Sequence, residues 1–161
     1  MSHRRLSVGV VLLSAITSAI LVSSGAEAAE QAPAEPEREV PTEATLGMPI
    51  YPTAVYLTSY DAGRGQRYYL FGTQASFVEM VRYYSTMLDE RGDRVFNAPA
   101  THTFEVGRFR KESMAFPPGV TIKDYTWNAS EGYLNPTPNA GNERFPTVIQ
   151  IVPPPADQSD R

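Results

Sequence analysis

The feature that most limits the possible folds is one amphipathic helical segment set among runs of strand-forming residues. Residues 76–91 read SFVEMVRYYSTMLDER, and apolar side chains recur there at intervals of four, three and four. That spacing places Phe77, Val81, Tyr84 and Leu88 on one side of a helix. Ser76 and Glu79 form a capping-box pattern at its start, and Gly92 is expected to cap its end.

Strand-like runs lie on both sides of this helix. Residues 54–60 and 66–73 are rich in β-branched and aromatic residues around a glycine-bearing turn, which predicts a hairpin. Later runs with strand character cover residues 94–97, 101–109, 112–116, 120–127 and 147–152. The last run, TVIQIV, is apolar at both parities, so we expect a central strand covered on both faces. The fold predicted is α+β, a single amphipathic helix packed on a mostly antiparallel sheet of five to seven strands.

The N-terminus has the pattern of a signal peptide in residues 1–28. Two arginines precede Leu6–Val22, which is uncharged and mostly apolar, and Ala26-Glu27-Ala28 is a small-x-small cleavage pattern. The apolar stretch is shorter than the about 20 residues that a spanning helix needs. We therefore expect cleavage after Ala28, export to the periplasm or the medium, and no stable membrane span afterwards. An uncleaved N-terminal anchor is the alternative.

The remaining chain divides by composition. Residues 29–47 carry three prolines and five glutamates against one arginine, which predicts a flexible acidic linker. Residues 48–153 are expected to form the α+β domain, and residues 154–161 a disordered tail. Within 48–153 ten acidic residues balance ten basic ones, so the charge balance indicates neither nucleic acid nor an anionic membrane surface as a partner.

A short region resembles small exported bacterial domains of unknown function. Tyr51-Pro52-Thr53-Ala54, the strand YYLFGT and the helix SFVEMVRYYSTML are similar to their Tyr-Pro-Gly-Ala segment, strand and Val-x-x-Tyr-Tyr helix. Thr53 stands in place of the glycine, and Asp93-Arg94 follows where an aromatic residue is common. The resemblance implies a bacterial envelope or secreted setting and implies no activity.

The inventory of reactive side chains excludes several kinds of site. The chain has no cysteine, which removes disulfides, a thiol nucleophile and cysteine zinc sites. His102 is the one histidine after residue 28, so a site made of several histidines is excluded. On a strand, His102 would point with Phe104 and away from Glu105. We expect a partly buried structural histidine, no catalytic residue, no metal and no cofactor; a hydrolase centred on His102 is the least favoured hypothesis.

The segment most suited to binding is residues 123–136, KDYTWNASEGYLNP, with the long loop that continues to Arg144. It places flat aromatic rings beside amide groups, a combination that suits ligand pockets with apolar walls and a few polar groups. The predicted ligand-binding residues are Tyr125, Trp127, Asn128, Tyr133 and Asn135.

The aromatic residues of this segment pose a question of strand parity. Val120 and Ile122 share one parity, whereas Tyr125 and Trp127 share the other. A regular strand would put the two aromatic residues on the face opposite Val120, and a bulge would return them to the core. We favour the core for both, because a small domain without disulfides needs large apolar side chains inside.

These observations together predict a non-catalytic binding module for a glycan-like or other small envelope ligand. A cell-wall glycan or an envelope protein is the expected partner. The alternative function is a protein-interaction or assembly domain of the envelope, which would use the loop or an exposed sheet edge.

Overall fold

The structure, a computed structural model, describes residues 39–155. The predicted signal peptide, most of the predicted linker and most of the predicted tail lie outside the described residues. The elements follow in the order α1 (Glu43–Leu46), β1 (Val55–Gly63), β2 (Gln66–Thr73), α2 (Phe77–Met87), β3 (Asp93–Asn97), β4 (Ala100–Glu105), β5 (Gly119–Asp124), the 3-10 turn η1 (Trp127–Ala129), β6 (Tyr133–Leu134), β7 (Arg144–Phe145) and β8 (Thr147–Val152).

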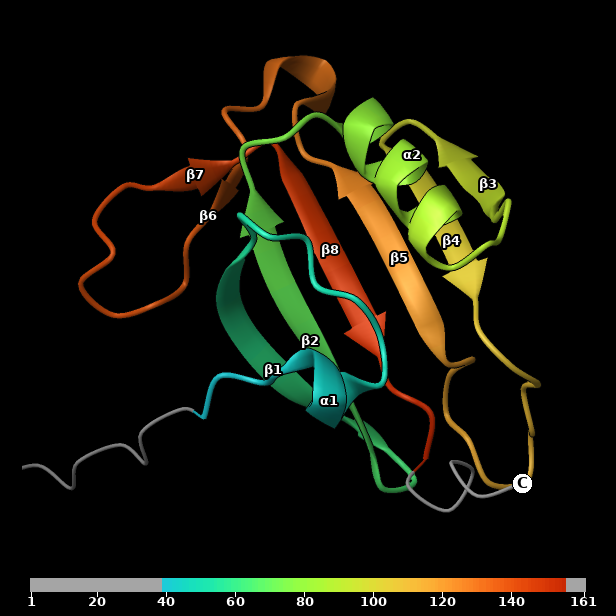
Figure 1. The fold of residues 1–161 in the computed structure, drawn as a ribbon. Helices are drawn as coiled ribbons and strands as arrows, with labels where there is room; N and C mark the ends of the chain where they lie inside the picture. The colour runs from blue at the N-terminus through green and yellow to red at the C-terminus, as the bar shows by residue number, and fades with distance from the viewer. Residues whose placement is uncertain (1–38, 156–161) are drawn as a thin grey trace, which may run out of the picture. The chain divides into compact units, whose positions relative to one another are not determined.

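The strands form one six-stranded antiparallel sheet in the order β1-β2-β8-β5-β4-β3, and β6 pairs with β7 separately. The predicted fold class, a helix on a mostly antiparallel sheet, is confirmed. The C-terminal strand β8 lies inside the sheet between β2 and β5, as its apolar sequence predicted (Figure 1). β1 and β3 form the two edges.

Helix α2 lies across β4 and β5 on one face of the sheet (Figure 1). The predicted capping box is present, since the Glu79 backbone N–H donates to Ser76 Oγ at 3.3 Å and the Ser76 N–H donates to Glu79 Oε2 at 2.9 Å. Met80 and Tyr84 are the fully buried residues of the helix. They belong to the core cluster with Leu46, Met48, Phe71, Phe104, Val120, Ile122, Ile149 and Ile151.

Three local predictions were wrong. The ordered domain starts before Met48, because α1 lies within the predicted linker and Leu46 is completely buried in the core. Helix α2 is capped at Leu88 rather than at Gly92. Gly92 instead passes close to β4, where an added Cβ would lie 2.7 Å from a Phe104 ring carbon. Residues 112–116 form a turn, not a strand.

The hairpin β6–β7 covers part of the sheet face opposite α2. Phe71 points into the core beneath the helix, so its neighbour Gly72 faces the other way. Phe145 of β7 is buried directly against Gly72, where an added Cβ would lie 2.3 Å from the ring. The glycine is therefore required for this close approach, and the hairpin is fixed to the sheet beside the end of β5.

Candidate functional site

The end of β5 is set by a side-chain turn at Asp124. Asp124 Oδ1 accepts hydrogen bonds from the Thr126 backbone N–H at 2.8 Å and from Thr126 Oγ1 at 2.6 Å. This Asx turn ends the strand before Tyr125, and η1 follows with Asn128 in the left-handed region at φ 55°. The chain therefore neither continues as a regular strand nor bulges, the two alternatives that the sequence suggested.

The turn brings Trp127 to the surface. Its side chain is 51% exposed, so the interpretation that placed it in the core is wrong. Tyr125 is half-buried, which leaves its ring partly available. Trp127 is exposed because Asp124 accepts two hydrogen bonds from Thr126, and the resulting turn directs the following residues out of the sheet.

Trp127 and Tyr125 line a cavity of about 270 Å³ at this end of the sheet. Its walls are mainly apolar, and they come from the end of β5, from η1 and from the β3–β4 turn. The lining residues are Pro99, Lys123, Asp124, Tyr125, Trp127 and Ser130. The cavity thus combines two aromatic walls with an ammonium, a carboxylate and a hydroxyl group.

Tyr133 packs against Tyr125 but does not itself line the cavity. Its ring meets the Tyr125 ring edge-on with centroids 5.0 Å apart. Burial raises the pKa of the Tyr133 hydroxyl, and the nearby phenols of Tyr60, Tyr125 and Tyr68 raise it further. Burial also raises the pKa of Tyr125. Tyr133 therefore holds Tyr125 in place within a group of tyrosines rather than presenting a free surface.

The two predicted asparagines are not lining residues of the cavity. Asn135 is buried: its Nδ2 donates to Glu143 Oε2 at 2.6 Å and its Oδ1 accepts from the Thr137 N–H at 3.0 Å. Both ends of this amide are used to close the β6–β7 loop, so Asn135 is structural. Asn128 is exposed in η1, where it forms the left-handed turn beside Trp127.

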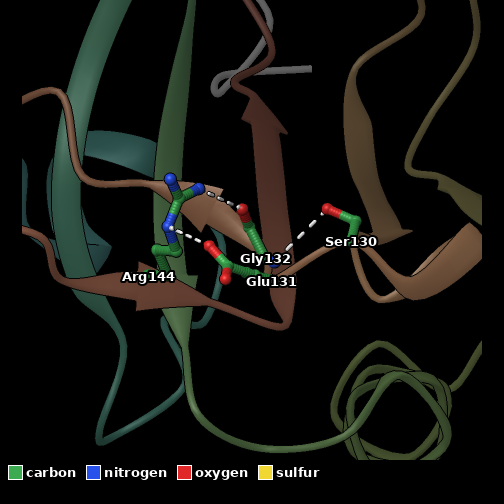
Figure 2. Close-up of polar contacts among 4 residues, drawn as sticks. All are labelled: Ser130, Glu131, Gly132 and Arg144. Carbon is green, nitrogen blue, oxygen red and sulfur yellow. Dashed lines mark hydrogen bonds and ion pairs between the residues drawn. The ribbon is translucent and has the colours of Figure 1, made fainter.

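Residues 130–132, which follow η1, are held to β7 by polar contacts (Figure 2). Arg144 donates from Nη1 to the Gly132 carbonyl at 3.1 Å, and its Nε lies 3.5 Å from Glu131 Oε2. The Gly132 N–H in turn lies 3.3 Å from Ser130 Oγ. The ion pair is exposed and contributes little by itself, but the contacts position Ser130 on the cavity wall.

A larger hollow of about 560 Å³ adjoins the first, because Asp124 lines both. It lies beside the start of α2, and its walls include Phe77, Arg94 and Thr126. The Arg94 guanidinium lies 5.5 Å from the centroid of the Phe77 ring. Two adjoining cavities therefore lie at this end of the sheet, and the Asp124 side chain lines both of them.

Sequence reasoning missed Pro99, Lys123, Asp124 and Ser130 as parts of the cavity. Three of them flank the aromatic residues along the chain, and the Asp-x-Thr pattern that produces the turn was a readable signal. Pro99 comes from the turn between β3 and β4, and only the pairing of β4 with β5 brings it there.

His102 occupies the structural position that its strand parity predicted. Its ring packs against Phe104 with centroids 4.8 Å apart, and its Nε2 lies 3.1 Å from the Arg91 carbonyl oxygen. Glu105 is exposed on the opposite face of β4. Residues 39–155 contain no group of three or more His, Cys, Asp or Glu side chains arranged to hold a metal ion.

Among residues 39–155, no helix combines the length and the apolar composition of a transmembrane span. No protein-family model matches the chain, and neither a curated protein nor a solved structure does so.

Proposed function

We propose that this domain is a non-catalytic binding module for a glycan-like ligand and that Trp127 forms the main contact. The observation that carries the proposal is the half-exposed Trp127 on the wall of a mainly apolar cavity that also contains Lys123, Asp124 and Ser130. A sugar ring has apolar C–H faces and a rim of hydroxyl groups. Aromatic walls suit the faces, and the three polar side chains suit the hydroxyls.

The size of the site favours an oligosaccharide over a single sugar. Ligand pockets usually measure about 300–1,000 Å³, and the first cavity alone, about 270 Å³, lies just below that range. The adjoining hollow beside Arg94 adds room on the other side of Asp124. A chain of two or three sugar units can therefore contact both.

The proposed setting is the bacterial envelope or the medium. It rests on the signal-peptide pattern of residues 1–28 and on the resemblance of residues 51–88 to small exported domains. A glycan-binding module in that setting would meet cell-wall polymers.

The test is calorimetric titration of the protein with oligomers of N-acetylglucosamine and with unrelated neutral oligosaccharides. Trp127→Ala should weaken binding by about thirtyfold, since truncating a central tryptophan of an interface removes about 2 kcal/mol or more. The same variant should lose less than about 1 kcal/mol of folding stability, because Trp127 lies outside the core. Because Trp127 is the single tryptophan, its fluorescence reports directly on occupancy.

Phe109→Ala is the matched control, since Phe109 is a comparably exposed aromatic residue in the connection that precedes β5, whereas Trp127 follows that strand. It should leave the titration unchanged. Unchanged affinity in Trp127→Ala, or a folded protein that binds none of these oligosaccharides, would refute the proposal. A loss of several kcal/mol of stability would instead identify Trp127 as a structural residue.

A second candidate function is pairing with an envelope protein through β3. All five residues of this edge strand are exposed, and they include the apolar side chains of Val95 and Phe96. An exposed edge strand can accept a strand from a partner. Val95→Lys should abolish capture of such a partner and leave oligosaccharide binding unchanged, which separates the two functions.

A further inference from the structure

The connection between β4 and β5 presents basic and aromatic side chains together at the surface. Residues 107–116, which we call the basic loop, contain Arg108, Arg110 and Lys111 within four positions and one acidic residue, Glu112. Phe109 is 40% exposed and Phe116 46% exposed. Residues 107–113 are exposed without interruption. The even charge balance of the domain as a whole concealed this local concentration of cations.

The basic loop is fixed by a buried polar side chain. Gln66 at the start of β2 is 5% exposed, and its Oε1 accepts hydrogen bonds from the Ala115 N–H at 2.6 Å and the Phe116 N–H at 3.1 Å. Its Nε2 donates to the Phe116 carbonyl at 3.0 Å. Three hydrogen bonds from one glutamine therefore set the position of Phe116.

Two further contacts secure the middle of the basic loop. Arg64, at the tip of the β1–β2 hairpin, donates from Nη1 to the carbonyls of Lys111 and Glu112, each at 2.8 Å. Met114 is buried beneath, and its backbone N–H donates to the Arg110 carbonyl at 2.8 Å. The exposed phenylalanines and cations thus belong to an anchored surface, and Arg64 adds a fourth positive charge beside it.

The basic loop lies at the end of the sheet where the chain enters the domain. Thr45 of α1 shares a small cavity with Gly65 and Gln66, and Gln66 in turn binds Phe116. Figure 1 shows α1, the β1–β2 tip and the loop between β4 and β5 at the same end.

We propose that the basic loop docks the domain on an anionic lipid membrane. Arg108, Arg110 and Lys111 would contact lipid phosphates, and Phe109 and Phe116 would enter the boundary between headgroups and acyl chains. Interleaved phenylalanines favour a lipid surface over a soluble polyanion such as polyphosphate, because polyphosphate offers them no apolar environment. The proposal does not depend on the ligand of the Trp127 cavity.

Docking in this way orients the proposed glycan site. The basic loop precedes β5, and the Trp127 cavity follows it, so the two lie at opposite ends of a six-residue strand, about 20 Å apart. The cavity would face away from the bilayer, toward polymers at a distance from the membrane.

The test uses the chain from Ala29 onward, which keeps every described residue, and vesicle flotation. Vesicles contain either phosphatidylcholine alone or phosphatidylcholine with phosphatidylglycerol. Binding should require phosphatidylglycerol and should be released by 1 M NaCl, where the Debye length falls to about 3 Å. Equal binding to both vesicle types, or no binding to either by a folded protein, would refute the proposal.

Matched variants separate specific docking from general charge attraction. Arg108→Gln with Lys111→Gln should weaken binding about thirtyfold, at about 1 kcal/mol for each cation near an anionic surface. Arg82→Gln with Arg91→Gln removes the same charge from exposed positions in and after α2 and should have little effect. Equal losses in the two pairs would show that only net charge matters and would overturn the assignment of the loop.

Insertion of the loop has its own readout. A Phe109→Trp variant made in a Trp127→Phe background should shift its emission to the blue on anionic vesicles. The natural Trp127, at the other end of the sheet, should not shift. An unshifted Trp at position 109, or binding to polyphosphate as tight as to vesicles, would contradict insertion into lipid.

Discussion

Removing the hydroxyl group of Tyr84 should stabilise this protein. Tyr84 is completely buried in the core, where its ring lies 5.0 Å from that of Tyr83 and 6.4 Å from that of Phe104. Its hydroxyl oxygen is buried and has no hydrogen-bond partner among the described residues. Burial raises the pKa of this hydroxyl well above its ordinary value, and the nearby Tyr51 backbone N–H, which lowers the pKa, offsets only part of that rise.

The expected gain follows from the cost of burying an unsatisfied hydroxyl. That cost is about 1–3 kcal/mol, and Tyr84→Phe removes it while it keeps the ring contacts. Part of the gain is offset by the small space that the oxygen leaves and by the weak attraction of the Tyr51 N–H. We expect a net stabilisation of about 1 kcal/mol, which corresponds to a rise of about 4 °C in Tm for a domain of this size.

The assay is urea denaturation at pH 7 together with a series of unfolding measurements between pH 9 and pH 11.5. Below the pKa of an unfolded tyrosine, about 10, both states keep the proton and pH has no effect through this group. Above it, the unfolded state releases the proton and the folded state keeps it. Stability therefore falls as pH rises, by up to about 1.4 kcal/mol per pH unit for one tyrosine. Tyr84→Phe should make this decline less steep.

Tyr83→Phe is the control, because the half-buried Tyr83 hydroxyl donates to the Ile50 carbonyl at 3.4 Å. It should be neutral or slightly destabilising at pH 7. Destabilisation of Tyr84→Phe by more than about 1 kcal/mol would refute the reasoning, since that is the effect of losing a satisfied buried hydrogen bond. An unchanged alkaline decline would show that Tyr84 does not keep its proton in the folded state.

Four further substitutions, two of them also combined in a double variant, test the fold and the site by chemical denaturation. Ser76→Ala should remove the capping box and destabilise the protein by about 1 kcal/mol. Gly72→Ala should destabilise it by about 1–3 kcal/mol through overpacking against Phe145. The double variant with Phe145→Leu should lose less than the sum of the two singles, and strict additivity would contradict the contact. Asn135→Ala should weaken folding by about 1–2 kcal/mol through its lost bond to Glu143 and leave oligosaccharide affinity unchanged; a selective loss of affinity would restore Asn135 as a ligand residue.

The sequence predicted best those features that depend on neighbours along the chain. The helix start at Ser76 and the internal position of β8 each follow from a local pattern of caps or apolar residues. The placement of the His102 and Phe104 side chains on the same face of β4 follows from strand alternation in the same way. Helix α1 escaped detection because it has four residues and one buried side chain, Leu46, inside an acidic proline-containing segment.

The candidate site was predicted in part, and the errors have separate physical causes. Tyr125 and Trp127 do line a cavity, but the exposure of Trp127 depends on whether Asp124 binds Thr126, and strand parity does not contain that information. Asn135 looked like a ligand group because its hydrogen-bond partner, Glu143, lies eight positions away in an irregular loop. Pro99 reaches the cavity through strand pairing, which composition does not reveal.

The position of β8 has a consequence for when the protein can fold. Strands β1 and β2 join strands β5, β4 and β3 only through β8, the last strand among residues 39–155. A nascent or translocating chain that has not yet released residues 147–152 therefore holds two incomplete sheet fragments with no strand between them. The sheet closes when residues 147–152 become free, so this domain completes its fold only after they have left the ribosome or the translocation pore.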